Sequence, residues 1–308
     1  MKQMTQEEYY LQAAQRGDFN TVEAMVRQKE VDIDAEDELG VTALIRASER
    51  GDVRMVSYLI EMGADINKKA CVTGETALLN ATENNHQEVI DMLLENGADI
   101  NVFNHYGKAP LMAAVLNGNG ILVNKFLDKG ANKNQVNLWG QTPLMRAVLC
   151  HKALLVETLV SAGADVQQQD NKGQTALHYA VLNKDREMVA LLVDYGANIN
   201  HADKNGQTVL DLACAKKDIE MFEFFVKYLN ADTCDIAKKV KQGLEQSFEY
   251  QVDSILNEKS DLLYKHAESR GLRENNGSES VKNMPSIVQK ARVLLLEMKQ
   301  KEKLKVKN

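Results

Sequence analysis

The chain has 308 residues, a formal net charge of −7 and only 6% aromatic residues. This mild acidity argues against bulk nucleic-acid binding, and the low content of aromatic residues and proline fits helical repeats better than a β-sandwich. No apolar run of about 18 residues is present, so we expect no transmembrane segment.

The N-terminal segment and the cysteines indicate an intracellular location. The segment MKQMTQEEYY lacks the apolar core of a signal peptide. The four cysteines, Cys71, Cys150, Cys214 and Cys234, are far apart and form no C-x-x-C pair, which is typical of reduced intracellular thiols. We therefore expect a cytoplasmic protein.

Two short motifs recur along the chain in steps of about 33 residues. The first is a glycine followed by a short apolar segment, as in DNKGQTALHYA, and its glycines are Gly40, Gly74, Gly107, Gly140, Gly173 and Gly206. The second is a G-A-[DN] turn, which starts at Gly63, Gly97, Gly130, Gly163 and Gly196. The step from Gly40 to Gly74 is 34 residues, which indicates one inserted residue.

Each repeat is predicted to contain a tight turn and two short helices, as residues 170–202 illustrate. Gly173 lies where the turn needs a positive φ, and Thr175 is placed to cap the first helix, which ends near Asn183. Apolar residues within 188–193 recur with a helical period, and Gly196 ends the second helix. Because no single unit can bury its apolar face, neighbouring units must stack.

The segments TALHYA (175–180), TPLMRA (142–147) and APLMAA (109–114), together with the G-A-[DN] turns, closely resemble the ankyrin repeat. The likeness runs from Tyr9 to about Leu229 and includes a degenerate first repeat in residues 7–36. It implies an all-α ankyrin-repeat solenoid of about seven helix-turn-helix repeats with β-hairpin fingers, over residues 1–230. The family's histidine survives only as His178, which we expect to be structural, and Asp211 takes its place in a capping last repeat.

The resemblance also implies where a partner binds. The residue before each turn glycine lies at a fingertip, and the short first helices line the concave face. Trp139 and Tyr106, on neighbouring fingers, are then exposed aromatic residues of the kind found in interface hot spots. The predicted partner-binding residues are Tyr106, Trp139, His105, Leu138, Lys108, Gln141, Leu116, Leu149 and Leu182. Two alternatives stay open: the two aromatic rings stack on each other, and the leucines pack inward.

No pattern in the sequence indicates catalysis. The six histidines are scattered without metal-ligand spacing, and no Rossmann, Walker or nucleophile-elbow motif is present. We therefore expect no cofactor, no metal and no enzymatic activity.

After about residue 230 the repeat stops, and residues 231–308 carry 15 basic against 12 acidic residues. They are predicted to form a helical extension with a helix over 232–267, a flexible linker near 268–285 and a basic amphipathic helix from Ser286. The last helix has three open interpretations: packing on the preceding helix, docking or self-association, and contact with a membrane surface or nucleic acid through its lysines.

The leading functional hypothesis is a non-catalytic protein–protein interaction scaffold that binds one protein partner on its concave and finger face. No nucleic-acid partner is expected. The alternative is a substrate-recruiting or effector subunit, including a bacterial protein secreted into a host cell, in which the C-terminal helices form a second functional module.

Overall fold

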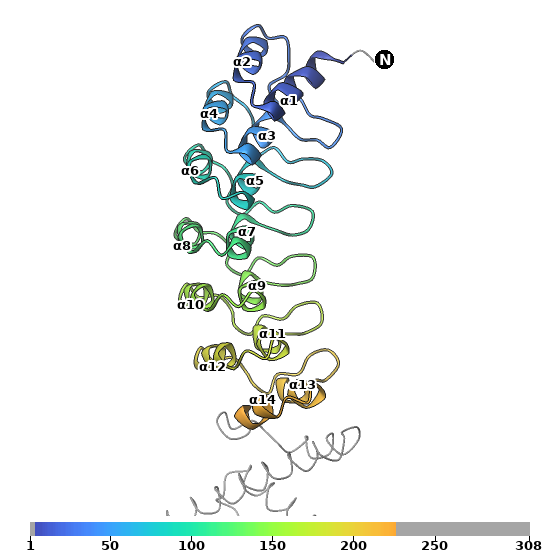
Figure 1. Ribbon diagram of the computed structural model, residues 1–308, viewed down its shortest axis with the longest axis vertical. Coiled ribbons are helices and arrows are strands. Elements are labelled where there is room, and N and C mark those ends of the chain that lie inside the picture. The colour runs from blue at the N-terminus through green and yellow to red at the C-terminus, as the bar shows by residue number, and fades with distance from the viewer. Residues whose placement is uncertain (1–3, 226–308) are drawn as a thin grey trace, which may run out of the picture. The chain divides into compact units, whose positions relative to one another are not determined.

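The computed structural model describes residues 4–225, which form fourteen helices in pairs (Figure 1). The chain divides into two compact units, 1–171 and 172–308. In the first unit, the first helices of the pairs are α1 (Gln6–Arg16), α3 (Ala43–Arg50), α5 (Ala77–Glu83), α7 (Pro110–Asn117) and α9 (Pro143–Leu149). The second helices are α2 (Phe19–Arg27), α4 (Val53–Glu61), α6 (Gln87–Glu95), α8 (Gly120–Asp128) and α10 (Ala153–Ser161).

Most helices of the first unit begin at an N-cap residue that recurs at the same position of successive repeats. The side chains of Thr42, Thr76 and Thr142 cap α3, α5 and α9, and those of Asp18, Asp52 and Asn119 cap α2, α4 and α8. Each cap accepts a hydrogen bond from the N–H three residues further on and stabilises its helix by about 1 kcal/mol. Short helices of this kind gain from such caps because their own hydrogen bonds are few, although α6, α7 and α10 begin without a side-chain cap.

The first helices of the first unit also end alike. The residue after the helix, or one further on, has a positive φ at Gly17, Gly51, Asn85, Gly118 and His151. A left-handed residue lets the last turn close and redirects the chain toward the second helix. Asn85 and His151 adopt this conformation in spite of their side chains, at φ +59° and +54°.

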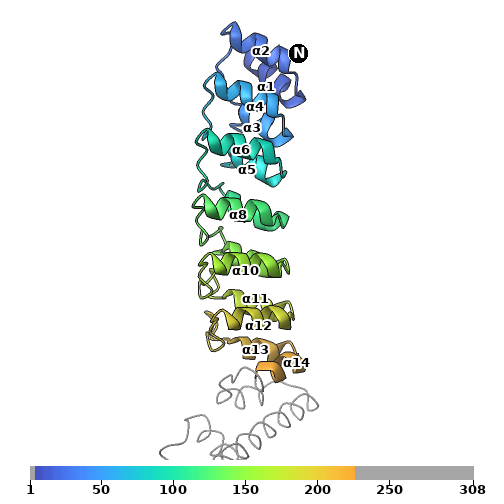
Figure 2. The ribbon, with the colours of Figure 1, turned by 90° about the vertical axis from the view of Figure 1, so that its left-hand side faces the viewer.

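The core of the first unit runs between successive first helices, where α3 packs on α5, α5 on α7 and α7 on α9. The alanines repeated at one phase, Ala47, Ala81, Ala114 and Ala147, are fully buried, and the repeated leucines, Leu44, Leu78, Leu111 and Leu144, are almost fully buried. The small alanines allow close helix approach, while each buried leucine contributes about 1.5–3 kcal/mol. The second helices form a row of their own, seen face-on in Figure 2.

Loops on one side of the first unit form the fingers (Figure 1). Each finger is closed at its base by a backbone hydrogen bond, such as Asn104 N–H to the Lys108 carbonyl (3.1 Å) and Asn137 N–H to the Gln141 carbonyl (3.0 Å). No strand forms within residues 4–225, and Ala202 and Thr208 form an isolated antiparallel bridge. The fingers are therefore hairpin-shaped loops closed by backbone hydrogen bonds, without the β-strands of the hairpins that the resemblance implied.

The second unit contains α11 (Ala176–Leu182), α12 (Arg186–Asp194), α13 (Val209–Ala215) and α14 (Ile219–Glu223). His178 is fully buried, and its Nδ1 accepts a hydrogen bond from the Thr175 N–H (3.2 Å). Because a backbone N–H can only donate, the ring proton lies on Nε2, which faces the Gln207 carbonyl at 3.4 Å. His178 therefore has the structural role expected of it.

Asp211 takes over part of this role in the last described repeat, where its carboxylate accepts from the Thr208 N–H (2.8 Å) and hydroxyl (3.0 Å). The predicted C-terminal extension, 231–308, lies outside the described residues. Within residues 4–225, no helix has the length and apolar character needed to cross a bilayer.

Candidate functional site

The tips of four successive fingers of the first unit carry exposed apolar side chains. We call these residues the fingertip row: Leu39, Val72, Tyr106, Leu138 and Trp139, which are 47, 58, 54, 59 and 60% exposed. Scattered exposed apolar residues are ordinary on protein surfaces, but a row of them within two residues before each turn glycine is typical of an interaction surface. Tyr106 and Trp139 are exposed, as their place before the turn glycines predicted.

The fingers are joined to each other at their tips by backbone hydrogen bonds. Val72 N–H donates to the Leu39 carbonyl (3.2 Å), and His105 N–H donates to the Thr73 carbonyl (2.8 Å). The same bond recurs from Leu138 N–H to the Tyr106 carbonyl (3.0 Å) and from Asn171 N–H to the Trp139 carbonyl (3.0 Å). The row is thus a continuous platform, which limits the entropy that its backbone loses when a partner binds.

An asparagine or aspartate three residues before the turn glycine fixes the shape of each regular finger. The Asn137 Oδ1 accepts from the N–H groups of Trp139 (3.0 Å) and Gln141 (2.9 Å). We call this pair of hydrogen bonds the Asx bracket, and Asn104 forms it in the preceding finger with Tyr106 and Lys108. Side chains of this type mimic a backbone turn. The sequence analysis missed the bracket, although the pattern [DN]-x-x-G is readable in the chain.

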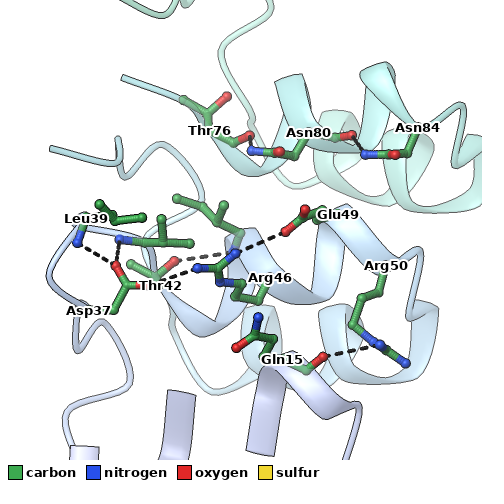
Figure 3. Close-up of polar contacts among 12 residues, drawn as sticks. Gln15, Asp37, Leu39, Thr42, Arg46, Glu49, Arg50, Thr76, Asn80 and Asn84 are labelled. Carbon is green, nitrogen blue, oxygen red and sulfur yellow. Dashed lines mark hydrogen bonds and ion pairs between the residues drawn. The ribbon is translucent and has the colours of Figure 1, made fainter. Parts of the chain in front are cut away.

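The first finger reinforces its Asx bracket with an ion pair (Figure 3). The Asp37 Oδ1 accepts from the N–H groups of Leu39 and Val41, and its other oxygen meets Arg46 at 3.0 Å. Burial alone would raise the pKa of Asp37, but the hydrogen bonds from Val41 and Arg46 outweigh it and hold the pKa below its usual value. Arg46 also reaches Glu49 at 3.4 Å, so one guanidinium serves two carboxylates.

The second finger holds the inserted residue of the 34-residue step. Ala70 stands at its base, where no side chain can form the Asx bracket. Gly74 N–H instead donates to the Ala70 carbonyl (2.7 Å), and Glu75 N–H donates to the Thr73 hydroxyl (3.4 Å). The exposed Cys71 lies in this finger, with its thiol 3.3 Å from the Glu36 carboxylate, which raises the thiol's pKa.

The two aromatic residues do not stack on each other. The ring pairs found in the described part of the chain do not include Tyr106 with Trp139. Each ring is more than half exposed, while its backbone is fixed by the Asx bracket and by the tip-to-tip hydrogen bonds. Both side chains are therefore available to a partner.

The remaining predicted site residues fall into two groups: polar residues that hold the fingers, and leucines that are partly buried. The His105 Nδ1 lies 3.0 Å from the Val72 carbonyl, and Lys108 forms an ion pair with Glu83 at 2.6 Å. The Gln141 Oε1 accepts from the Asn137 amide (3.2 Å). These three polar residues thus stabilise the fingers and their contact with the neighbouring first helix. The leucines are partly buried: Leu116 and Leu149 in the first unit, and Leu182 at the end of α11 in the second.

Within residues 4–225, no group of three or more histidine, cysteine, aspartate or glutamate side chains is placed to hold a metal ion. The thiol of Cys214 is buried, which raises its pKa to about 12 and makes it a poor nucleophile. The geometry described so far supports contact with a partner through apolar side chains.

The family model for ankyrin repeats (3 copies) matches residues 11–104, 103–170 and 151–238. These ranges cover most of the chain, so the chain belongs to the ankyrin repeat family. Domains of this family are generally protein-binding modules and typically non-catalytic.

Two solved ankyrin repeat domains are similar to the chain. The domain of human ASB11 is 28% identical with a TM-score of 0.57, and the match covers 66% of this chain and 90% of that domain. The domain of Bcl-3, described as a unique member of the IkappaB protein family, is 26% identical with a TM-score of 0.59, covering 66% and 92%. The comparison with curated proteins found no match.

Proposed function

We propose that this protein is a non-catalytic scaffold that binds a protein partner through the fingertip row. The observation that carries the proposal is the exposure of Tyr106 and Trp139 on adjacent fingers whose backbones are already fixed. Exposed aromatic residues supply large contact area with few rotatable bonds, and they dominate the binding energy of many interfaces.

The fingertips are better anchors for a partner than the first helices beside them. On the first helices, Leu116 and Leu149 are partly buried, and Glu83 is already paired with Lys108. Surface ion pairs contribute about 0–1 kcal/mol, and a partner that breaks one must replace it. We therefore place the centre of the contact at Tyr106, Leu138 and Trp139, with the first helices at its edge.

The test is an affinity purification from cell lysate with the full chain and its Tyr106→Ala/Trp139→Ala variant, read by mass spectrometry. The matched control is Ile121→Ala/Leu154→Ala, because these residues are 74 and 77% exposed on α8 and α10, in the row of second helices. Loss of two hot-spot residues worth about 2 kcal/mol each, taken as additive, lowers affinity by about 1,000-fold.

The expected result is a partner retained by the wild-type protein and the control variant but absent with Tyr106→Ala/Trp139→Ala. Circular dichroism must show the same helix content in all three proteins. Equal recovery of the partner by all three would refute the assignment of the fingertip row.

A further inference from the structure

The two ends of the fingertip row differ in charge. Residues 32–38 of the first finger contain five carboxylates and no basic residue: Asp32, Asp34, Glu36, Asp37 and Glu38. The equivalent stretches of the next three fingers are much less acidic: residues 65–72 contain Asp65 with Lys68 and Lys69, residues 99–105 contain Asp99, and residues 132–138 contain Lys133 and no carboxylate. The row therefore runs from an anionic end to an apolar, aromatic end.

The anionic end keeps a net negative charge after its ion pairs are counted. Glu36 pairs with Lys68 at 2.8 Å, and this hydrogen bond is the main reason that the pKa of Glu36 is lowered. Asp37 pairs with Arg46, which is shared with Glu49. Glu38 is exposed. Two basic side chains, Lys68 and Arg46, thus pair with a group of six carboxylates, namely the five in residues 32–38 and Glu49.

We propose that the occupant of the fingertip row is a protein segment with apolar or aromatic side chains at one end and lysine or arginine at the other. Its apolar end covers Tyr106, Leu138 and Trp139, and its basic end lies over residues 32–38. This inference rests on the proposed function and adds the chemistry and direction of the partner. Complementary charge fixes the register of an interface and raises its association rate more than it raises affinity.

The spacing of the fingers limits the length of this segment. Packed helices lie about 8–10 Å apart, so three steps from the first to the fourth finger span about 30 Å. An extended segment covers this distance with about 9 residues, and a helix with about 20. Apolar side chains must recur on one face about every 10 Å, which corresponds to every third residue of a polyproline II segment or every seventh of a helix.

The first experiment selects binders to the full-length protein from a random library of displayed peptides about 20 residues long. Enriched peptides are expected to combine an apolar, aromatic cluster with lysine or arginine toward the other end. Enriched peptides without basic residues, or with acidic ones in that place, would overturn the inference.

The second experiment measures the affinity of the most enriched peptide for Glu36→Gln/Glu38→Gln. The matched control is Glu88→Gln/Glu95→Gln, which removes the same charge from exposed positions on α6. At about 0.1 M salt we expect a three- to tenfold loss for the finger variant and less than twofold for the control, with the difference shrinking at about 1 M. Equal effects of the two variants would contradict the proposal.

The direction of the segment is tested with a photo-crosslinker at the basic end of that peptide. Crosslinks must map to residues 32–41 or 71–73, and crosslinks at 138–139 would overturn the proposed direction. The opposite direction would place the basic residue over the indole of Trp139, an arrangement that competes because cations bind aromatic faces.

The two proposals fail in different ways. A peptide that requires Tyr106 and Trp139 but binds Glu36→Gln/Glu38→Gln normally overturns the polarity and leaves the proposed function in place. A peptide that is indifferent to both sets of substitutions overturns both.

Discussion

The substitution Gly107→Ala should destabilise the first unit through a contact between neighbouring fingers. Gly107 has φ +74°, and a Cβ there would lie 2.7 Å from the Asn137 Cα and 3.0 Å from the Val136 carbonyl oxygen. The left-handed conformation costs a non-glycine residue about 1–2 kcal/mol. Because the contacted atoms belong to the backbone, the fourth finger must move, which costs a further ~1–3 kcal/mol. We expect a total loss of about 2–5 kcal/mol.

A second glycine separates these two contributions. Gly97 has φ +89°, but a Cβ there would meet nothing within 4 Å. Gly97→Ala should therefore lose only the conformational part, about 1–2 kcal/mol. The difference between the two variants isolates the contact with the neighbouring finger.

Urea unfolding followed by far-UV circular dichroism measures both losses. Trp139 fluorescence provides a second readout, because Asn137 brackets the finger that carries the indole. Gly107→Ala should change the emission of the folded state, whereas Gly97→Ala should leave it unchanged. Equal losses of stability with identical emission would refute the argument that adjacent fingers are in backbone contact.

Three further predictions follow from the described residues. Lys29→Gly should raise the free energy of unfolding by about 1 kcal/mol in urea unfolding, since the exposed Lys29 occupies a left-handed conformation at φ +56°; a loss of stability would show that the lysine side chain stabilises the turn. Glu36→Gln should speed the alkylation of Cys71 at a pH of about 8, because the carboxylate raises the pKa of the thiol and its loss increases the thiolate fraction. Peptide mapping should show the change at Cys71 and none at Cys150. Finally, the free protein should show red-shifted, readily quenched Trp139 emission that shifts to the blue on partner binding; shielded emission in the free protein would contradict the exposure of the indole.

The repeats and their helices could be predicted because they depend on local signals at a fixed phase. The turn glycines and the buried alanines recur in every regular unit, and the N-cap threonine recurs in all but one, where Ala109 precedes α7, so each copy supports the others. The same argument identified Tyr106 and Trp139 as exposed, since the residue before the turn glycine has no neighbouring element to cover it.

The details of the fingers could not be predicted in the same way. Whether Leu116 and Leu149 are exposed depends on how much of each is covered by the adjoining repeat, which a sequence period does not specify. The ion pair of Lys108 with Glu83 joins residues 25 apart through the stacking of repeats. The Asx bracket was not predicted for a different reason. Aspartate and asparagine are common in exposed turns, where contact with water is enough to explain them.

The Asx bracket separates the residues that build a finger from those that occupy its tip. In the third and fourth fingers, Asn104 and Asn137 hold the backbone, while the side chains of Tyr106 and Trp139 take no part in closing the turn. Mutation at the tips can therefore change what the protein captures at little cost to folding. Related proteins with the same backbone can therefore acquire different partners by exchanging a few outward-facing residues.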